Sequence, residues 1–484
     1  MKLYNTLTAK IDDIAPLNPP RVTVYTCGPT VYDYPHIGNW FTFIRYDLLV
    51  RTLKAAGLEP EWVMNITDVG HLVSDADEGE DKLEKGARRE GKTAWDVATF
   101  YANYFQNGLR RLNITRPAHL PKATDHIPEQ IALVEQLEAK GYTYTTGDGI
   151  YYDTSKFEGY ASFARLDLDA LQAGARVEHN PEKRNISDFA LWKFSPADHQ
   201  RDMEWDSPWG KGFPGWHLEC SAMCMKYLGE TVDIHSGGID HVPVHHTNEI
   251  AQSEAATGKR FASYWVHTNH VTVEGEKISK SLGNSITLED IEKKGFSLTA
   301  FRLHVLESHY RSQSKFSWDA LEAAQNRLKR WQEIADRRWQ VVQPQHFLES
   351  LPTGPEESDK TEAEHPYTKL GTQAVAQFKH ALQNDLDTPK ALAAVELLFA
   401  AIEQNGMASF YLSALTQLLQ QMQYVLGIDL FSDDITTAQK AVIGQREAAR
   451  ENKNWAASDS LRDQLQAQGI GLRDTPQGAI WYHL

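Results

Sequence analysis

Alternating apolar runs and helix-period patterns share the first part of the chain. The run RVTVYT, residues 21–26, alternates along its length and precedes FTFIRYDLLVRTLKAAG, residues 41–57, whose apolar residues recur at helical spacing. A second apolar run, EPEWVMNITDVG (59–70), ends at a polar turn, and TAWDVATFYANYFQNGLRRL (93–112) is amphipathic. This alternation predicts a parallel α/β sheet, in which ligands bind at the carboxyl ends of the strands.

The pattern changes after about residue 115. Aromatic runs in GYTYTTGDGIYYDTSKF (141–157) flank a TGDG turn and predict a β-hairpin, and PEKRNISDFALWKF (181–194) predicts a turn followed by a strand. We interpret this stretch as an inserted α+β module. The parallel pattern returns in ETVDIHSGGIDHVPVHHTNEIAQSEAATG (230–258), which indicates a strand, a glycine-rich turn and a helix.

The chain becomes helical after about residue 290. The stretch SWDALEAAQNRLKRWQEIADRRWQ (317–340) is one example, and the acidic, proline-containing residues that follow have the composition of a linker. A second helical block covers 367–428. The tail, 437–484, is expected to pair one polar helix, GQREAARENKNWAASDSLRDQLQAQG (444–469), with two short strands, IGLRD and GAIWYHL.

Composition narrows the class of protein. A length of 484 residues implies several domains, and no apolar run approaches the roughly 20 residues that span a bilayer. Three cysteines and a start that lacks the features of a signal peptide predict a cytoplasmic protein with no membrane partner. The net charge of −16 argues weakly against a nucleic-acid partner, but a slight basic excess in 301–340 and 437–484 leaves a polynucleotide partner open.

The cysteines and a histidine pair suggest a metal site. His245 and Glu249 lie four residues apart on one face of a predicted helix, and zinc takes thiolate, imidazole and carboxylate ligands. The candidate ligands are Cys27, Cys220, His245 and Glu249. From spacing alone, His246 could replace His245, and Cys224 could replace Cys220. All three cysteines could instead be small buried apolar residues.

Two further motifs suggest a nucleotide site. PHIGNW places His36 beside Gly38 at a strand-to-helix turn, where a helix N-terminus can meet an anion. EGEKISKSLGNSITLED carries Lys277 and Lys280 on either side of Ser279, and two ammonium groups suit a triphosphate. Either motif alone is weak, since a lone histidine after proline and a lysine-rich loop are both common. Their combination is far more specific.

These motifs carry a family resemblance. HIGN and KISKS resemble the HIGH and KMSKS signatures of class I aminoacyl-tRNA synthetases. The segments CGPTVYDYPHIGN, NITDVGH, PGWHLECSAM, DIHSGGIDH, HHTNEIAQS and KISKSLGN resemble, in order, the motifs of the cysteinyl-tRNA synthetases. The similarity continues through SHYRSQSKFSWDAL and DLDTPKALAAV to WAASDSLRDQLQAQGIGLRDTPQGAIW, and so covers nearly the whole chain.

The resemblance implies a Rossmann-like parallel-sheet catalytic domain, split by an inserted α+β module and followed by helical and small mixed α/β tRNA-binding domains. The implied segments are 1–115 (catalytic domain, first half), 116–204 (inserted connective module), 205–275 (second half, with the zinc ligands), 276–340 (KMSKS-like loop and stem-contact helices), 341–366 (linker), 367–430 (helical bundle) and 437–484 (anticodon-binding domain). We expect a monomer.

The resemblance also implies the chemistry. L-Cysteine and ATP, accompanied by Mg2+, give cysteinyl-adenylate, and the cysteinyl group passes to the terminal ribose of tRNA(Cys). Positioning and electrostatics dominate such reactions. The family's zinc ligands correspond to Cys27, Cys220, His245 and Glu249, and one Zn2+ per chain would select the substrate thiolate over serine. The groups implied to act on ATP are His36, Gly38, Asn39, Lys277 and Lys280. Those implied to lie near the substrate cysteine are Thr67, Trp216 and Asp240.

Three positions depart from the family pattern. Asn39 replaces the last histidine of HIGH, and its amide can still donate to phosphate. Ile278 replaces the methionine of KMSKS at a position expected to pack. Thr247 replaces a glutamate that is not a metal ligand, so only local hydrogen bonding is affected.

The sequence leaves two other functions open. A zinc-stabilised nucleic-acid-binding protein would need no catalysis, and a related ligase could transfer activated cysteine to a small amine. The presence of residues 367–484 favours tRNA as the acceptor. In the tail, Trp481 is our candidate for a surface on which an unpaired base stacks.

Overall fold

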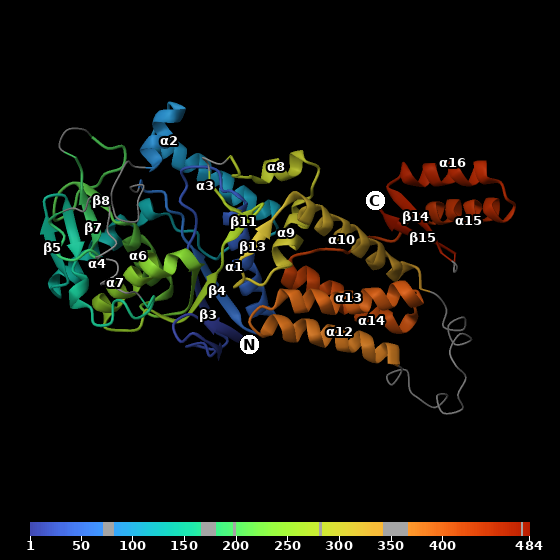
Figure 1. Cartoon of the computed structure of the whole chain (residues 1–484), viewed down its shortest axis with the longest axis horizontal. Coiled ribbons are helices and arrows are strands. Elements are labelled where there is room, and N and C mark those ends of the chain that lie inside the picture. Colours follow the sequence, from blue (N-terminus) through green and yellow to red (C-terminus); the bar gives the residue numbers. More distant parts are fainter. Residues whose placement is uncertain (71–81, 166–180, 197–199, 280–282, 342–365, 476–477) are drawn as a thin grey trace. The chain divides into compact units, whose positions relative to one another are not determined.

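The computed structural model describes residues 1–70, 82–165, 181–196, 200–279, 283–341, 366–475 and 478–484 (Figure 1). These residues form two compact units. The first comprises Met1–Asp290 with Tyr310–Lys315, and the second comprises Ile291–His309 with Phe316–Leu484. Most of the predicted linker, 342–365, lies outside the described residues. No described helix combines the length and the apolar character needed to cross a membrane.

A four-stranded parallel sheet forms the centre of the first unit. Its strand order is β10 (Ala262–Thr268), β9 (Val232–Gly238), β3 (Arg21–Thr26) and β4 (Glu59–Met64). Val24 of β3 lies opposite Ile234 of β9 and Trp62 of β4. Because these three strands are parallel, their carboxyl ends lie at the same edge of the sheet. Five of the six residues of β3 are buried, so the strand is covered on both faces although it carries two threonines. The predicted parallel α/β class is confirmed.

Helices cover this sheet. Helix α1 (Ile37–Ala55) contacts β4 and β9, and α6 (Trp216–Leu228) contacts β3, β4 and β9. After β9, the π-helical turn Val242–His246 leads into α7 (Thr247–Thr257). The described part of this unit also contains α2 (Lys82–Glu90), α3 (Ala94–Arg111) and α4 (Ile127–Ala139).

A second, antiparallel sheet is formed by three strands of the predicted inserted module, 116–204, and by one strand that follows it. Its strands run in the order β5 (Thr143–Thr146), β6 (Gly149–Tyr152), β7 (Phe189–Phe194) and β8 (Gly212–Pro214), which confirms the predicted hairpin and the strand after it. Two smaller sheets are also described before the tail. They are β1 (Lys2–Asn5) with β2 (Lys10–Asp13), and β11 (Val271–Val273) with β12 (Glu276–Lys277) and β13 (Ser314–Phe316).

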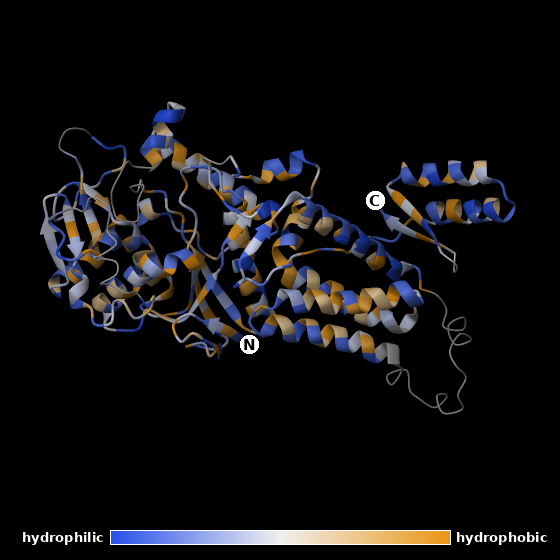
Figure 2. Ribbon diagram, in the orientation of Figure 1, coloured by the Kyte–Doolittle hydropathy of each residue, from blue (hydrophilic) through white to orange (hydrophobic). Residues whose placement is uncertain are grey.

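The second unit is mainly helical, as predicted. Helix α8 (Leu288–Lys293) begins before it, and the unit continues with α9 (Leu298–Leu306), α10 (Trp318–Asp336), α12 (Pro366–Gln383), α13 (Thr388–Asn405) and α14 (Ser409–Gln421). Apolar and polar residues interleave along these helices (Figure 2), as is typical of amphipathic helices that share a core.

The tail differs from the expectation of a single helix. It contains α15 (Thr437–Glu451) and α16 (Trp455–Gln466), followed by the two predicted strands, β14 (Ile470–Thr475) and β15 (Gly478–His483), which pair antiparallel. The helix breaks because Lys453 adopts a left-handed backbone conformation, with φ of 56°, and Asn454 caps α16 by accepting from the backbone N–H of Ala457.

The core of the tail corrects a second expectation. Trp481 is only 4% exposed and packs with apolar residues of both tail helices, including Ile443 and Leu465. The prediction that its ring is a surface for base stacking is therefore wrong. The alternation of side chains along β15 places this residue on the face that packs against the helices.

Candidate active site

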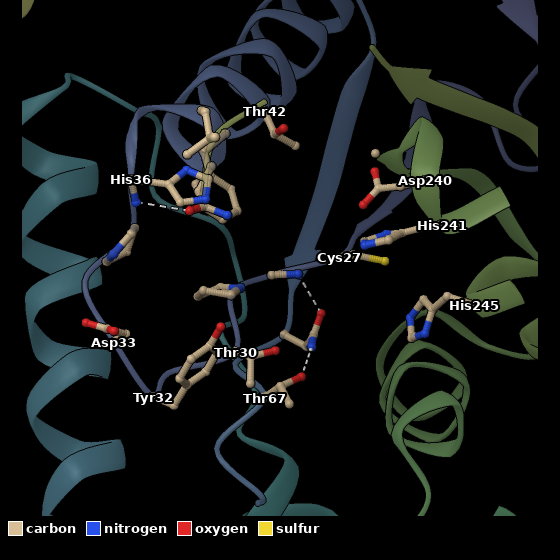
Figure 3. Close-up of a pocket in the computed structure, with 18 of the residues that line it drawn as sticks. Cys27, Thr30, Tyr32, Asp33, His36, Thr42, Thr67, Asp240, His241 and His245 are labelled. Carbon is tan, nitrogen blue, oxygen red and sulfur yellow. Dashed lines mark hydrogen bonds between the residues drawn. The ribbon is translucent and has the colours of Figure 1, made fainter. Parts of the chain in front are cut away.

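A cavity of about 580 Å³ lies at the carboxyl ends of the parallel strands (Figure 3). Eight of the predicted site residues line it: Cys27, His36, Asn39, Thr67, Trp216, Cys220, Asp240 and His245. The segment EGEKISKSLGNSITLED (274–290), which we call the lysine loop, contributes Ile278 and Ser279 to the wall of the cavity. Gly38, Lys277 and Glu249 are not among the described lining residues. Lys280 lies outside the described residues.

Four buried side chains form a candidate metal cluster. The ligand atoms of Cys27, Cys220, His245 and Glu249 all lie within 4.8 Å of one another. Each comes from a different segment: the end of β3, helix α6, the π-helical turn, and the first turn of α7. Sulfur, imidazole and carboxylate ligands in this number fit a tetrahedral zinc ion.

A second set meets the same distance limit. It shares two residues with the first and consists of Cys27, His235, His246 and Glu249. Cys224 belongs to neither set; it lies on α6, one turn after Cys220, and packs in the core.

The hydrogen bonds around Glu249 favour the first set. Nε2 of His235 lies 2.8 Å from Oε2, whereas Oε1 makes no hydrogen bond and faces Nε2 of His245 at 3.0 Å. The other nitrogen of His245, Nδ1, has a partner in His217 at 2.9 Å. Histidine and carboxylate ligands of metals are usually held in this way through the atom that does not bind the metal.

His246 is held differently. Its Nδ1 lies 2.7 Å from Nε2 of His267, and its Nε2 lies 3.3 Å from Sγ of Cys27. Both ring nitrogens therefore already have partners. This arrangement suits a residue that supports Cys27 better than one that binds the ion itself.

The pKa values of the cluster follow from burial and mutual contacts. Burial raises the pKa of Cys27 well above its usual value, whereas a hydrogen bond with Cys27 lowers the pKa of Cys220. Burial also raises the pKa of Glu249, but the imidazoles of His235 and His245 outweigh it and lower the value to about 2. Burial lowers the pKa of His245, but Glu249 and Cys220 raise it to about 10. Without a cation, Glu249 is thus ionised, His245 is protonated and Cys27 keeps its proton, so a metal ion must displace protons from its ligands.

The other predicted pocket residues surround this cluster. The ring of Trp216 lies 4.4 Å from that of His245, measured between centroids. Asp240 follows β9, and Cys27, His241 and His245 lie on the same side of the cavity as Asp240 (Figure 3). The sequence did not single out His241, although it belongs to the quoted segment DIHSGGIDH.

The HIGN motif forms the opposite side of the cavity. His36 is the N-cap of α1, and its backbone N–H donates to Oδ1 of Asn39 at 3.0 Å. The amide nitrogen of Asn39 is then the atom that can donate to a ligand. A Cβ added at Gly38 would lie 2.8 Å from the His36 ring and 3.0 Å from Cδ1 of Ile278. Gly38 therefore permits the close approach of the lysine loop.

Hydrogen bonds of Asn284 join the two described parts of the lysine loop, which end at Ser279 and begin again at Gly283. Asn284 accepts from the backbone N–H of Ser279 at 2.8 Å and donates to the carbonyl of Lys277 at 3.0 Å. Further along, Glu289 accepts from the hydroxyl of Tyr104 and from Nη1 of Arg111. The backbone N–H of Ile37 also donates to the carbonyl of Ile286 at 2.8 Å. The two motifs, distant in sequence, thus meet at one cavity.

Comparison with known proteins first defines the class. A model of the class I (C) tRNA synthetase catalytic domain matches residues 13–326. The structure of Mycobacterium tuberculosis methionyl-tRNA synthetase in complex with methionyl-adenylate shares the fold, with a TM-score of 0.61 and 14% identity, over 84% of this chain and 92% of that one. The parallel sheet and the meeting of HIGN with KISKS are therefore set in a class I synthetase fold.

The relatives then narrow the class to one family. A model of the cysteinyl-tRNA ligase anticodon-binding domain matches residues 432–481. The cysteine–tRNA ligase of Treponema denticola is 42% identical over 498 residues, covering 100% of both chains. Cysteine–tRNA ligase 1 of Burkholderia lata is 43% identical over 484 residues, covering 99% of this chain and 96% of that one. The chain belongs to the cysteine–tRNA ligase family, which confirms the resemblance.

Buried histidines are the part of the site that sequence reasoning missed. His217, His235 and His267 are each at most 5% exposed and hold the candidate ligands or their neighbours. A signal was present in β9, where Asp233 and His235 interrupt a strand whose apolar neighbours predict burial. Buried polar residues in a strand need partners, and this requirement points to a site.

Proposed function

We propose that this chain activates L-cysteine with ATP and transfers the cysteinyl group to tRNA(Cys). One observation carries the proposal: a cavity lined by Cys27, Cys220 and His245 is also lined by His36 and Asn39 at a helix N-terminus. A cluster suited to a thiol and a site suited to phosphate therefore share one space of about 580 Å³. An amino acid joined to a nucleotide needs such an arrangement.

In this proposal the amino acid is selected at the metal cluster. Cys27, Cys220, His245 and Glu249 hold a zinc ion, which, when bound, prefers the soft thiolate of cysteine to the hydroxyl of serine. Trp216 and Asp240 border the substrate, and Thr67 lies beside it. His235 and His217 orient the ligands through the atoms that do not bind the ion.

The activation step uses groups on the opposite side of the cavity. The cysteine carboxylate attacks the α-phosphorus of ATP, a new O–P bond forms, and pyrophosphate leaves with the electrons of the broken bond. His36, Asn39 and the N-terminus of α1, beside Gly38, stabilise the developing charge. Lys277 and Lys280 neutralise the pyrophosphate, with Mg2+ bound to ATP. In the second step a ribose hydroxyl of the tRNA attacks the activated carbonyl, and AMP leaves.

The second unit supports tRNA as the acceptor. The match to an anticodon-binding domain over 432–481 supports this role for the tail, 437–484. Within it, Trp455 is 56% exposed, and the guanidinium of Arg450 lies 5.6 Å from its ring centroid. An exposed aromatic ring beside a cation suits an unpaired base, so we assign to Trp455 the stacking role first expected of Trp481. The segment boundaries, the monomeric state and the cytoplasmic location predicted from the sequence remain part of this proposal.

Two assays test the proposal. Cysteine-dependent ATP–pyrophosphate exchange measures activation, and charging of tRNA(Cys) measures transfer, with serine as the matched control amino acid. Exchange without charging would favour a ligase that acts on a small amine. The absence of both activities in a zinc-loaded protein that binds RNA would favour a nucleic-acid-binding protein without catalysis.

A further inference from the structure

Three hydrogen bonds form a continuous chain beside the cavity. The backbone N–H of Gly28 donates to Oδ1 of Asn65 at 2.8 Å, and Nδ2 of Asn65 donates to Oγ1 of Thr67 at 3.0 Å (Figure 3). The hydroxyl of Thr67 in turn donates to Oε2 of Glu219 at 3.0 Å. The chain joins the loops that follow β3 and β4 to helix α6.

The direction of this chain is fixed at both ends. A backbone N–H can only donate, so the carbonyl oxygen of Asn65 faces Gly28 and its NH2 group faces Thr67. A carboxylate accepts, so the proton of the Thr67 hydroxyl points toward Glu219. A hydroxyl oxygen has two lone pairs, and Asn65 uses one of them. The second lone pair of the Thr67 hydroxyl is therefore left to accept a further hydrogen bond.

Thr67 can accept this bond from a ligand in the cavity. Gly28, Asn65 and Thr67 line it together with Cys27 and Cys220, whereas Glu219 is fully buried and is not among the described lining residues. Glu219 can therefore influence a ligand through the hydroxyl of Thr67 and through its charge. A buried carboxylate behind a hydroxyl acceptor makes this part of the wall favourable for a positive group.

We propose that Glu219 and Asn65 are positioning residues that hold Thr67 as the acceptor for the α-ammonium group of the amino-acid substrate. The inference rests on the proposed function, because the cluster of Cys27 and Cys220 then holds the thiol. In cysteine the ammonium nitrogen and the sulfur are three bonds apart. The thiol cluster and the Thr67 hydroxyl thus recognise the two ends of one small ligand.

The test compares two ligands that differ only in the ammonium group. L-Cysteine carries it, and 3-mercaptopropionate lacks it but keeps the thiol and the carboxylate. Calorimetry on the zinc-loaded full-length protein gives both dissociation constants. In Glu219→Gln the amide can donate to Thr67, so the hydroxyl loses its fixed direction and the wall loses its negative charge. We expect cysteine to bind roughly tenfold more weakly or worse, and 3-mercaptopropionate to change less than about twofold.

Further variants keep the result interpretable. Thr67→Val removes the hydroxyl at nearly constant volume and should show the same ligand-specific loss, and Thr67→Ser should restore cysteine binding. Glu254→Gln is the matched control, since Glu254 accepts from the backbone N–H of Phe261 at 3.0 Å away from this cavity. Zinc content and the thermal midpoint report whether each variant is folded.

The outcomes are distinct. Equal weakening of both ligands in Glu219→Gln would mean a merely structural role and would overturn the inference, as would unchanged cysteine binding in either Glu219→Gln or Thr67→Val. If Glu219→Gln does not fold, Thr67→Val alone decides between these results. Failure of the wild-type protein to bind either thiol would instead contradict the proposed function.

Discussion

Nε2 of His235 lies 2.8 Å from Oε2 of Glu249, and both side chains are completely buried. A carboxylate can only accept a hydrogen bond, so His235 is the donor, and its proton fixes the orientation of the glutamate. Oε1 is then directed toward His245, 3.0 Å away. This pair explains why His235 acts as a support in our proposal, although it also belongs to the second possible ligand set.

The first prediction tests this role of His235. Replacing it by Gln should weaken zinc binding by roughly 10- to 100-fold, the usual cost of losing a residue that orients a metal ligand. Competition with a chromophoric chelator measures the affinity. The matched control is His126→Gln, because His126 is buried against Lys122 and Tyr227 and belongs to neither set. Complete loss of zinc in His235→Gln, together with full zinc binding in Cys220→Ser, would identify the second set as the real one.

The second prediction concerns the cysteines. Metal analysis should find about one zinc per chain, and Cys27→Ser should weaken both zinc binding and cysteine activation because a serine hydroxyl is a poor ligand for zinc. ATP binding should remain largely intact. Cys224→Ser provides the control, since Cys224 is buried on α6, the helix that also carries Cys220, but lies outside both sets. Full activity in metal-free wild-type protein would contradict the zinc role.

These cases show what the sequence can and cannot predict. The apolar runs at 21–26 and 59–70 are local patterns, and they were enough to predict the sheet. The four-residue spacing of His245 and Glu249 is also local, but spacing alone left His246 and Cys224 as alternatives, and the set of four candidate ligands came from the family resemblance. The roles of His235 and Glu219 depend on which strands and helices pack together. The polar residues within β9 indicate a site, but no local pattern shows which side chain His235 contacts. The burial of Trp481 was missed for the same reason, since it depends on which face of a hairpin meets two helices.

The third prediction concerns Lys280, which lies outside the described residues. Lys280→Ala should lower the maximal rate of ATP–pyrophosphate exchange by about 100-fold or more, because its charge is needed most as pyrophosphate leaves. Lys259→Ala removes an equal charge from an exposed ion pair with Glu230 and should leave the rate unchanged. If Lys280→Ala raised only the Michaelis constant for ATP, the lysine would merely hold ATP in the ground state.

The fourth prediction is a pH dependence at Asp68. Its carboxylate is 4% exposed and accepts from the N–H and the hydroxyl of Thr124, but burial dominates and raises its pKa to about 6. In the unfolded chain the Asp68 carboxyl has an ordinary pKa near 4. Between about pH 4 and pH 6 it has therefore lost its proton in the unfolded chain but keeps it in the folded protein. Stability from this group is therefore greatest below about pH 4, falls as the pH rises, and is fully lost above about pH 6.

Replacing Asp68 by Asn removes this titration. The unfolding free energy of Asp68→Asn minus that of wild type should increase by about 2–3 kcal/mol from pH 4 to pH 7. The changed hydrogen bonds add a constant difference that does not vary with pH. Denaturant unfolding followed at several pH values gives the difference. A difference between the two proteins that did not vary with pH would show that Asp68 has no raised pKa.

The last prediction concerns Trp455, at the start of α16. Because its ring is largely exposed, Trp455→Ala should raise the Michaelis constant for tRNA by an amount corresponding to about 1–3 kcal/mol, the usual value of one stacked base. ATP–pyrophosphate exchange should not change, since the described residues that line the catalytic cavity all belong to the first unit. Trp455→Phe keeps an aromatic surface and should retain most of the binding.

Trp455→Ala tests tRNA binding by the tail more specifically than deletion of residues 437–484 does. Deletion should also abolish efficient charging and spare exchange, but it would uncover Asp336, a buried carboxylate that accepts from the backbone N–H of His483 at 2.8 Å. Loss of charging could then reflect damage to α10. Trp455→Ala leaves that contact in place, so charging with an unaltered Michaelis constant in this variant would show that the base stacks elsewhere.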